Sequence, residues 1–323
     1  MLRFRSALAI CVFVRLFATY GLAQEQETGE ATSKPGPEKP VVDPQAGDPA
    51  SDQSQLDRAT STPETKGFWF WEAADLTEPL VTDRPDFTES TDAVPRGRFQ
   101  LEMGYTFTYD REEKDRVRNH TAPEFLLRVG LFDDFELRLG WEGYSWSENQ
   151  FEGQTRGGRS VIRENWTQGS NDVLIGFKYK FFEQDGLRPH FGIIGALSMP
   201  SGSSSVSSGD VDPELVLLWA YDVTDWFSVA GNVGMAVPTE ESGRFLQTSS
   251  SLSAAFAVSD EVGTYVEYFG FYPNADNSDA AHSLNAGVTY LITDNFQLDV
   301  RAGFGLNEEA DDFFTGVGFS WRW

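Results

Sequence analysis

The 323-residue sequence is poor in cysteine, histidine and basic residues, and each shortage excludes a class of function. It contains one cysteine, Cys11, and three histidines. Because Cys11 lies in an N-terminal segment that we expect to be removed, the mature chain has no thiol for a disulfide, a metal site or a nucleophile. Basic residues number 25 against 50 acidic ones, and the net charge of −25 argues against nucleic acid as a partner.

Long apolar runs are also missing after Ala23. No segment approaches the roughly 18 consecutive apolar residues that characterise a transmembrane helix, which excludes an α-helical membrane protein. The N-terminus has its own pattern: a basic start, a mostly apolar stretch from Ala7 to Tyr20, and the small-residue end Gly21-Leu22-Ala23. This order indicates a secretory signal peptide over residues 1–23.

Residues 24–66 change in composition. Pro, Glu, Asp, Ser, Gln and Thr dominate, and aromatic residues are absent. Such a segment does not bury enough apolar surface to offset the entropy lost on ordering, so it is expected to be a disordered acidic tail. Two roles remain open for it, a tether in the periplasm and a segment that binds the cell wall or a partner.

The last eleven residues, from Phe313 to Trp323, alternate between two kinds of side chain. One row is apolar and largely aromatic apart from Thr315, and the other is mostly small or polar. This two-residue period indicates a strand with one apolar and one polar face. An aromatic carboxy-terminus directly after such a strand is typical of bacterial outer-membrane barrels, and the alternative is the edge strand of a soluble sandwich. In the barrel interpretation, the signal for the barrel-assembly machinery comprises Phe319, Trp321 and Trp323.

The same alternation recurs from Phe99 onward and predicts about twelve strands of roughly ten residues each. Short turns such as Phe132-Asp133-Asp134 alternate with longer polar connections, which we expect to be loops at Asp110 to Arg116, Ser147 to Gly169 and Pro200 to Asp210. Short turns on one side and longer loops on the other are the outer-membrane pattern. Residues 97–323 are therefore predicted to form an all-β, antiparallel transmembrane barrel in the bacterial outer membrane.

If the apolar rows face lipid, the polar rows face the lumen. Both signs of charge occur there, and a charge in a narrow lumen must be paired or hydrated. Two alternatives follow: a mutually paired network that supports the barrel, or the lining of a channel that selects solutes by size and charge. The expected lumen-lining residues are Glu102, Glu124, Arg128, Glu136, Arg138, Lys178, Lys180, Glu267, Asp299, Arg301 and Arg322.

Residues 67–96 precede the barrel and do not alternate. The aromatic cluster from Gly67 to Glu72 fits either a membrane interface or the periplasmic mouth of the barrel. Further on, Arg84 lies between two acidic residues, and Pro85 resists regular pairing. We expect an irregular segment at the periplasmic rim or inside the lumen, with a role in gating, and the alternative is a solvated loop. The residues of this plug or rim hypothesis are Thr82, Asp83, Arg84, Pro85, Asp86, Phe87 and Thr88.

Motifs for catalysis are scarce. No metal-ligand spacing, Gly-rich phosphate loop or nucleophile elbow occurs, so we expect no metal, no cofactor and no enzymatic activity. A hydrolase triad needs a serine, a histidine and an acid within hydrogen-bond reach, whereas the neighbours His282 and Ser283 would point to opposite faces of a strand. An outer-membrane hydrolase is the third hypothesis for function.

Short motifs follow one another in order over residues 79–323. They are T-D-R-P-D-F-T (82–88), G-R-F-Q-L-E-M-G (97–104), L-R-V-G-L (127–131), F-E-L-R (135–138), N-D-V (171–173), G-F-K-Y (176–179), E-Y-F-G (267–270), Q-L-D (297–299) and G-V-G-F-S (316–320). In this order the chain resembles the family of outer-membrane transporters known as the MetA-pathway of phenol degradation. The resemblance implies a barrel that passes small organic molecules and has no established catalytic residues. The acidic tail, the aromatic cluster and the final Trp depart from the family pattern.

These patterns together predict one outer-membrane barrel behind a periplasmic tail. The first hypothesis for function is a channel for passive uptake or efflux of small organic solutes, including aromatic or hydrophobic ones. The alternative is a closed structural barrel that tethers the envelope through its tail. The expected partners are outer-membrane lipid and lipopolysaccharide, the barrel-assembly machinery through the final strand, and a small-molecule solute.

Overall fold

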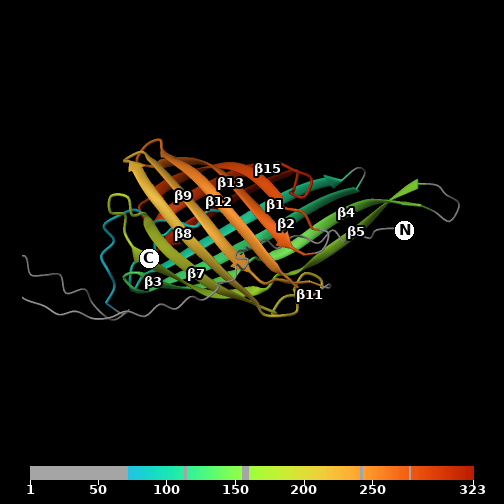
Figure 1. Cartoon of the computed structure of the whole chain (residues 1–323), viewed down its shortest axis with the longest axis horizontal. Coiled ribbons are helices and arrows are strands. Elements are labelled where there is room, and N and C mark those ends of the chain that lie inside the picture. The colour runs from blue at the N-terminus through green and yellow to red at the C-terminus, as the bar shows by residue number, and fades with distance from the viewer. Residues whose placement is uncertain (1–71, 113–114, 155–159, 241–242, 276–277) are drawn as a thin grey trace, which may run out of the picture. The chain divides into compact units, whose positions relative to one another are not determined.

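Twelve antiparallel strands close into a barrel in the computed structural model, which describes residues 72–112, 115–154, 160–240, 243–275 and 278–323. The ring closes because β1 pairs with β16 on one side and with β2 on the other (Figure 1). The predicted signal peptide, the acidic tail and the aromatic residues 68–71 lie outside the described residues. The strands of the ring are β1 (Phe99–Glu112), β2 (Asp115–Phe132), β3 (Phe135–Trp141), β6 (Val173–Phe182), β7 (His190–Met199), β8 (Asp212–Thr224), β9 (Phe227–Ala236), β12 (Leu246–Ala257), β13 (Val262–Asn274), β14 (Ala281–Thr293), β15 (Phe296–Gly305) and β16 (Phe313–Arg322).

Two further strands, β4 (Tyr144–Gln154) and β5 (Ser160–Ser170), form a hairpin that continues the wall beyond the ring (Figure 1). The long strand β2 pairs with β3 through its second half and with β4 through its first half. The prediction of an outer loop over residues 147–169 is therefore wrong. This hairpin has no continuous apolar row, and a ladder of backbone hydrogen bonds between two solvated faces does not need one.

The first connection is also shorter than predicted. β1 extends to Glu112 and β2 begins at Asp115, so most of the expected loop from residue 110 to 116 is paired strand. The connection between β7 and β8 is non-strand, as expected for residues 200–210. Between β9 and β12, the short strands β10 (Thr239–Glu240) and β11 (Gly243–Arg244) pair with each other.

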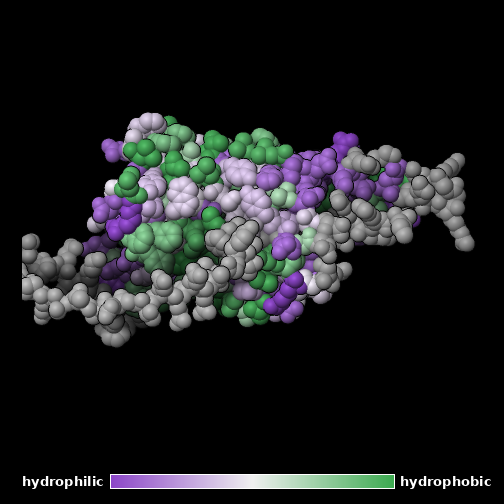
Figure 2. All heavy atoms as spheres, in the orientation of Figure 1, coloured by the Kyte–Doolittle hydropathy of each residue, from purple (hydrophilic) through white to green (hydrophobic). Residues whose placement is uncertain are grey.

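Charged side chains are buried inside the barrel, and apolar side chains are exposed outside it. On β3, Glu136 and Arg138 are 0% and 5% exposed, whereas their neighbours Leu137 and Leu139 are 44% and 42% exposed. Adjacent strand residues face opposite sides of the wall, so one strand displays both patterns. Figure 2 shows hydrophobic residues over much of the visible face of the barrel strands. This arrangement is expected where lipid surrounds the wall, and it confirms that the apolar rows face outward.

Aromatic rings gather on the wall at the end that carries the short turns. Trp226, in the turn before β9, stacks on Phe256 with ring centroids 6.2 Å apart, and Trp321 lies 4.8 Å from Trp323 by the same measure. Such a girdle is typical of a barrel wall at the membrane interface. The predicted outer-membrane β-barrel of about twelve strands is confirmed. Within the described ranges, no helix has the length and apolar character needed to cross a membrane.

The carboxy-terminal strand seals the ring against β1. The Trp323 amide donates to the Phe99 carbonyl at 3.0 Å, the Phe99 amide donates back at 3.1 Å, and the two rings stack at 5.8 Å. Phe319 and Trp321 face the same side and pair across the seam with Met103 and Leu101. The role of Phe319, Trp321 and Trp323 as an assembly signal stays a prediction.

Candidate functional site

Residues 78–96, which we call the inner segment, lie inside the barrel and bond to its inner wall. The Leu80 amide donates to the Asp294 carbonyl at the turn between β14 and β15, and the Val94 amide donates to Glu136 on β3 at 2.7 Å. The segment therefore runs from the short-turn end into the lumen and returns to that end, where β1 begins. Because irregular backbone has no ladder of its own, it needs polar side chains of the wall to satisfy its buried amides and carbonyls.

Asp83 is the centre of a buried ionic cluster. Its carboxylate accepts hydrogen bonds from Lys178 at 2.7 and 2.9 Å and from Arg138 at 2.5 Å, and it lies 3.3 Å from Arg128. Its backbone amide donates to Glu102 at 3.2 Å. Arg128 and Lys178 are 1% and 0% exposed, so the cluster is essentially out of water. Removing one member of such a cluster leaves an uncompensated buried charge, which costs about 3–5 kcal/mol.

Arg84, the next residue, bonds to the neighbouring part of the wall. It bonds to Glu124 on β2 at 2.9 Å and to Asp299 on β15 at 3.2 Å. Its guanidinium lies against Gly104 on β1 and Gly318 on β16, and a Cβ at either glycine would overlap with it. The two glycines thus leave the space that this side chain occupies, and a larger residue at either position would have to displace it.

A second carboxylate, Glu267 on β13, binds the middle of the inner segment. It accepts the amide of Phe87 at 2.8 Å, the amide of Thr88 at 2.5 Å and the side-chain amide of Asn285 at 2.6 Å. The Thr88 hydroxyl also bonds to Ser251 on β12 at 2.7 Å. Thr88 is therefore fixed by both backbone and side chain.

All eleven predicted lumen residues lie inside the barrel, and each makes a hydrogen bond to the inner segment. Besides those described above, Arg301 donates to the Pro85 carbonyl at 2.9 Å, Lys180 to Asp92 at 2.7 Å and Arg322 to the Glu78 carbonyl at 2.6 Å. The predicted plug or rim residues from Thr82 to Thr88 all belong to the inner segment, with Thr82 accepting a bond from Gln297 at 3.1 Å. The wall and the segment thus form one connected polar network.

The sequence did not single out several members of this network. Glu89 pairs with Arg138 at 2.8 Å, and the Asp92 carbonyl accepts a bond from Arg128 at 2.7 Å. Gln100, on the inner row of β1, donates to the Val81 carbonyl at 2.8 Å. The acidic residues near Thr88 were a usable signal, because the inner rows carry basic residues that need partners.

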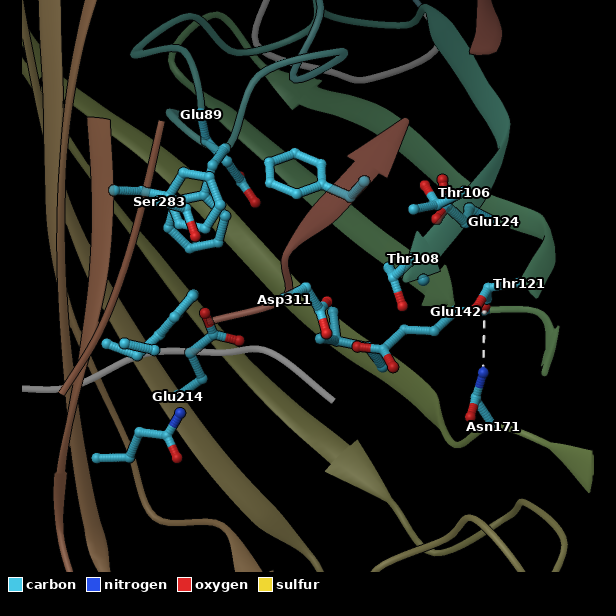
Figure 3. A pocket seen from close by; sticks show the side chains of 18 of the residues that line it. Glu89, Thr106, Thr108, Thr121, Glu124, Glu142, Asn171, Glu214, Ser283 and Asp311 are labelled. Atoms are coloured by element: carbon cyan, nitrogen blue, oxygen red, sulfur yellow. Dashed lines mark hydrogen bonds between the residues drawn. The ribbon is translucent and has the colours of Figure 1, made fainter. Parts of the chain in front are cut away.

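A cavity of about 520 Å³ remains open above the inner segment, toward the end with the longer connections. Figure 3 shows Glu89, Glu214 and Asp311 projecting into it from the inner segment, β8 and the β15–β16 connection. Its lining includes only three basic residues, Arg84, Arg138 and Arg301, against eleven acidic ones. The acidic residues are Asp83, Asp86, Glu89, Glu102, Glu124, Glu142, Glu214, Glu240, Asp279, Glu309 and Asp311.

Aromatic rings form part of the same cavity. Phe87 stacks on Phe269 at 4.9 Å and meets Phe271 edge-on at 5.2 Å, and Phe314 lies 5.9 Å from Phe269. The cavity therefore combines a hydrophobic floor with an acidic surround, a lining that suits small neutral or cationic solutes with an apolar part.

The three histidines lie apart from this cavity. The His120 and His282 rings bond to the hydroxyls of Tyr105 and Tyr268 at 2.8 and 2.7 Å. His190 lies between Glu183 and Asp222 at the short-turn end. Within the described residues, these ring partners are tyrosine hydroxyls, carboxylates and one backbone amide, and no cluster of three His, Cys, Asp or Glu side chains has metal-binding geometry.

A known outer-membrane channel shares the fold at low sequence identity. The COG4313 outer membrane channel from Pseudomonas putida F1 superimposes with a TM-score of 0.56 at 11% identity, over 74% of this chain and 99% of that one. The NanC porin has a TM-score of 0.40 at 10% identity, over 69% and 98% of the two chains. No curated protein sequence matches the chain.

The match to a protein family covers part of the inner segment as well as the barrel wall. A family model described as "Putative MetA-pathway of phenol degradation" matches residues 82–323, which span the strands of the ring and the inner segment from Thr82 onward. The chain therefore belongs to this MetA-pathway family.

Proposed function

We propose that the protein is an outer-membrane channel through which small organic solutes diffuse, with the inner segment as its gate and the N-terminal tail in the periplasm. The observation that carries the proposal is the cavity of about 520 Å³ inside a closed barrel. This volume falls within the roughly 300–1,000 Å³ that is usual for small-molecule sites. A barrel that served only as a structural element would have no need of such a space.

The lining indicates which solutes suit the channel. Phe87, Phe269 and Phe271 offer apolar surface at the base of the cavity, and the acidic surround attracts cations and repels anions. Solutes with an aromatic or other apolar part, neutral or positively charged, fit this combination. The membership of the chain in a family named after phenol degradation is compatible with aromatic solutes.

A closed structural barrel is the second candidate, and one observation favours it. The inner segment is tied to the wall by all eleven predicted lumen residues, several of them fully buried. If that network never opens, the lumen transmits nothing. The two candidates therefore differ in whether any solute crosses the intact protein.

The test is osmotic swelling of liposomes that contain the refolded full-length protein, with heat-modifiable gel mobility as the check that the barrel has formed. The solutes are benzyltrimethylammonium, benzenesulfonate and sucrose, which do not cross lipid unaided. A channel gives swelling in the order benzyltrimethylammonium, sucrose, benzenesulfonate. Rates equal to those of protein-free liposomes for all three would contradict the channel and support the structural barrel.

A further inference from the structure

The lumen contains a second cavity, of about 310 Å³, at the short-turn end. It reaches Asp222 and Trp226 at the connection between β8 and β9. Arg84 and Asp86 line both this small cavity and the large one, and Pro85 lines the small one. Residues Arg84, Pro85 and Asp86, which we call the strap, thus lie between the two cavities.

We propose that solutes cross the inner segment at the strap and then follow one side of the wall, along β9, β12 and β13, to the short-turn end. This inference rests on the proposed channel function and adds the route to it. It also assigns the small cavity as the exit chamber of that route. Only three residues need to move to join the two cavities, while the rest of the inner segment stays in place.

The side of the wall next to the small cavity is built from small residues. Ser228 on β9, Ala255 on β12 and Gly263 on β13 line the small cavity. The opposite side is filled, because Arg128 and Lys178 extend into the lumen and are fully buried around Asp83. At the short-turn end of the lumen, the free space therefore lies beside β9, β12 and β13.

Within the strap, only Asp86 is held less firmly than its neighbours, because Arg84 pairs with Glu124 and Asp299 and the Pro85 carbonyl accepts a bond from Arg301 at 2.9 Å. These links have to break when the strap moves. Asp83, directly before it, has four charged or polar partners in the wall, and Thr88, shortly after it, bonds to both Glu267 and Ser251. Asp86 accepts one side-chain bond, from Ser253 at 3.2 Å, and lies within electrostatic range of the like-charged Glu267. Pro85 has no amide hydrogen to bond with.

The lining of the small cavity resembles that of the large one in charge. It carries the carboxylates of Asp86, Asp222 and Asp225 and a single guanidinium, that of Arg84. The aromatic side chain of Tyr265, on the inner row of β13 with Glu267, also lines it. A solute that suits the large cavity, neutral or cationic with an apolar part, therefore meets the same chemistry on both sides of the strap.

The test compares two reversible cross-links in full-length protein whose one native cysteine, Cys11, is replaced by serine. The first pair, Asp86→Cys with Ser253→Cys, ties the strap to β12 across the present 3.2 Å contact. The matched pair, Thr88→Cys with Ser251→Cys, ties the neighbouring part of the segment to the same strand across a 2.7 Å contact. Each pair is joined by oxidation or by a short bis-methanethiosulfonate, and conductance is recorded before and after reduction.

The expected result is a loss of conductance with the first cross-link, restored by dithiothreitol, and unchanged conductance with the second. Loss with both cross-links would show that the whole segment has to leave, and conductance with both would show that the route lies elsewhere. Either outcome overturns the inference while leaving the channel intact. Absence of conductance from the uncross-linked parent would instead overturn the channel function itself.

A second measurement tests the side of the wall directly. Ser228→Cys places a thiol in the small cavity, whereas Ser320→Cys places one on the inner face of β16, at a residue that is 0% exposed and lines neither cavity. A cationic methanethiosulfonate is expected to reduce conductance through the first variant and to leave the second unchanged. Equal reactivity at the two positions would contradict a one-sided route.

Discussion

The guanidinium of Arg84 occupies the place where a side chain at Gly104 would lie. A hypothetical Cβ on Gly104 overlaps with the guanidinium, so the residue type on β1 decides whether the inner segment reaches its ion pairs with Glu124 and Asp299. This relationship links a single glycine of the wall to the closed state of the lumen.

Gly104→Ala is therefore expected to expel the Arg84 side chain and raise the conductance of the full-length protein. The matched control is Gly140→Ala, since a Cβ there meets Leu174 at 3.3 Å and touches no part of the inner segment. Single-channel recording of the two variants is the measurement. An unchanged conductance in Gly104→Ala would show that Arg84 does not hold the lumen closed.

Asp83→Asn tests the buried ionic cluster next to Arg84. Loss of this charge leaves Lys178, Arg128 and Arg138 with too few carboxylates, and a broken buried cluster costs about 3–5 kcal/mol. We expect faster proteolysis of the inner segment and a lower free energy of unfolding in urea. Asp75→Asn, at an exposed position before the inner segment, should change neither. Equal protection in both variants would contradict the anchoring role of Asp83.

The eleven acidic and three basic residues around the large cavity predict cation selectivity. In a salt gradient, the sign of the reversal potential should show that cations permeate better than anions. The magnitude of this potential should fall when the salt concentration is raised on both sides, because salt screens the lining charges. Glu309→Gln, in the lining of the cavity, should reduce it, whereas Glu261→Gln, on the short turn between β12 and β13, should not. Anion selectivity of the wild type would contradict this electrostatic account.

Asp311 makes the selectivity depend on pH. The Asp311 side chain is exposed at the cavity, but desolvation by the protein atoms around its carboxylate and the neighbouring charge of Asp110 raise the pKa of Asp311 to about 6. As pH falls from 7 to 5, Asp311 takes up a proton and the cavity loses one negative charge, so cation selectivity should fall. Asp311→Asn should lose this part of the pH dependence. The control Asp185→Asn, at the short-turn end, should retain it, and equal profiles in all three proteins would refute the assignment.

The wall of the barrel was predictable because its information is local. A strand in lipid displays its environment in every second residue, so Leu137 and Leu139 identify the outside and Glu136 and Arg138 the inside. The β4–β5 hairpin was not predicted, because it lacks the apolar alternation that identifies a strand in lipid. On β5 the side chains from Val161 to Trp166 are exposed on both faces, and they form no apolar row.

The partners of the inner residues were not predictable, because they depend on contacts far apart in the sequence. Asp299 and Arg84 are 215 positions apart, and Phe87 and Glu267 are 180 apart. Alternation between neighbouring residues gives no information about pairs so far apart in the sequence. The sequence showed that the lumen charges needed partners, and it named Thr82 to Thr88 as a segment near them. Only the structure shows that the lumen charges and this segment bond to one another. It also shows that Gly104 and Gly318 leave room for the Arg84 side chain.

The most direct test of the account is single-channel conductance of the refolded full-length protein beside a variant that lacks residues 24–90. We expect small, cation-selective steps for the full-length protein and larger steps for the shortened one, because the deletion removes Asp83, Arg84 and Thr88 from the lumen. Absence of steps in both proteins, with heat-modifiable mobility showing intact barrels, would contradict the channel and leave a closed structural barrel.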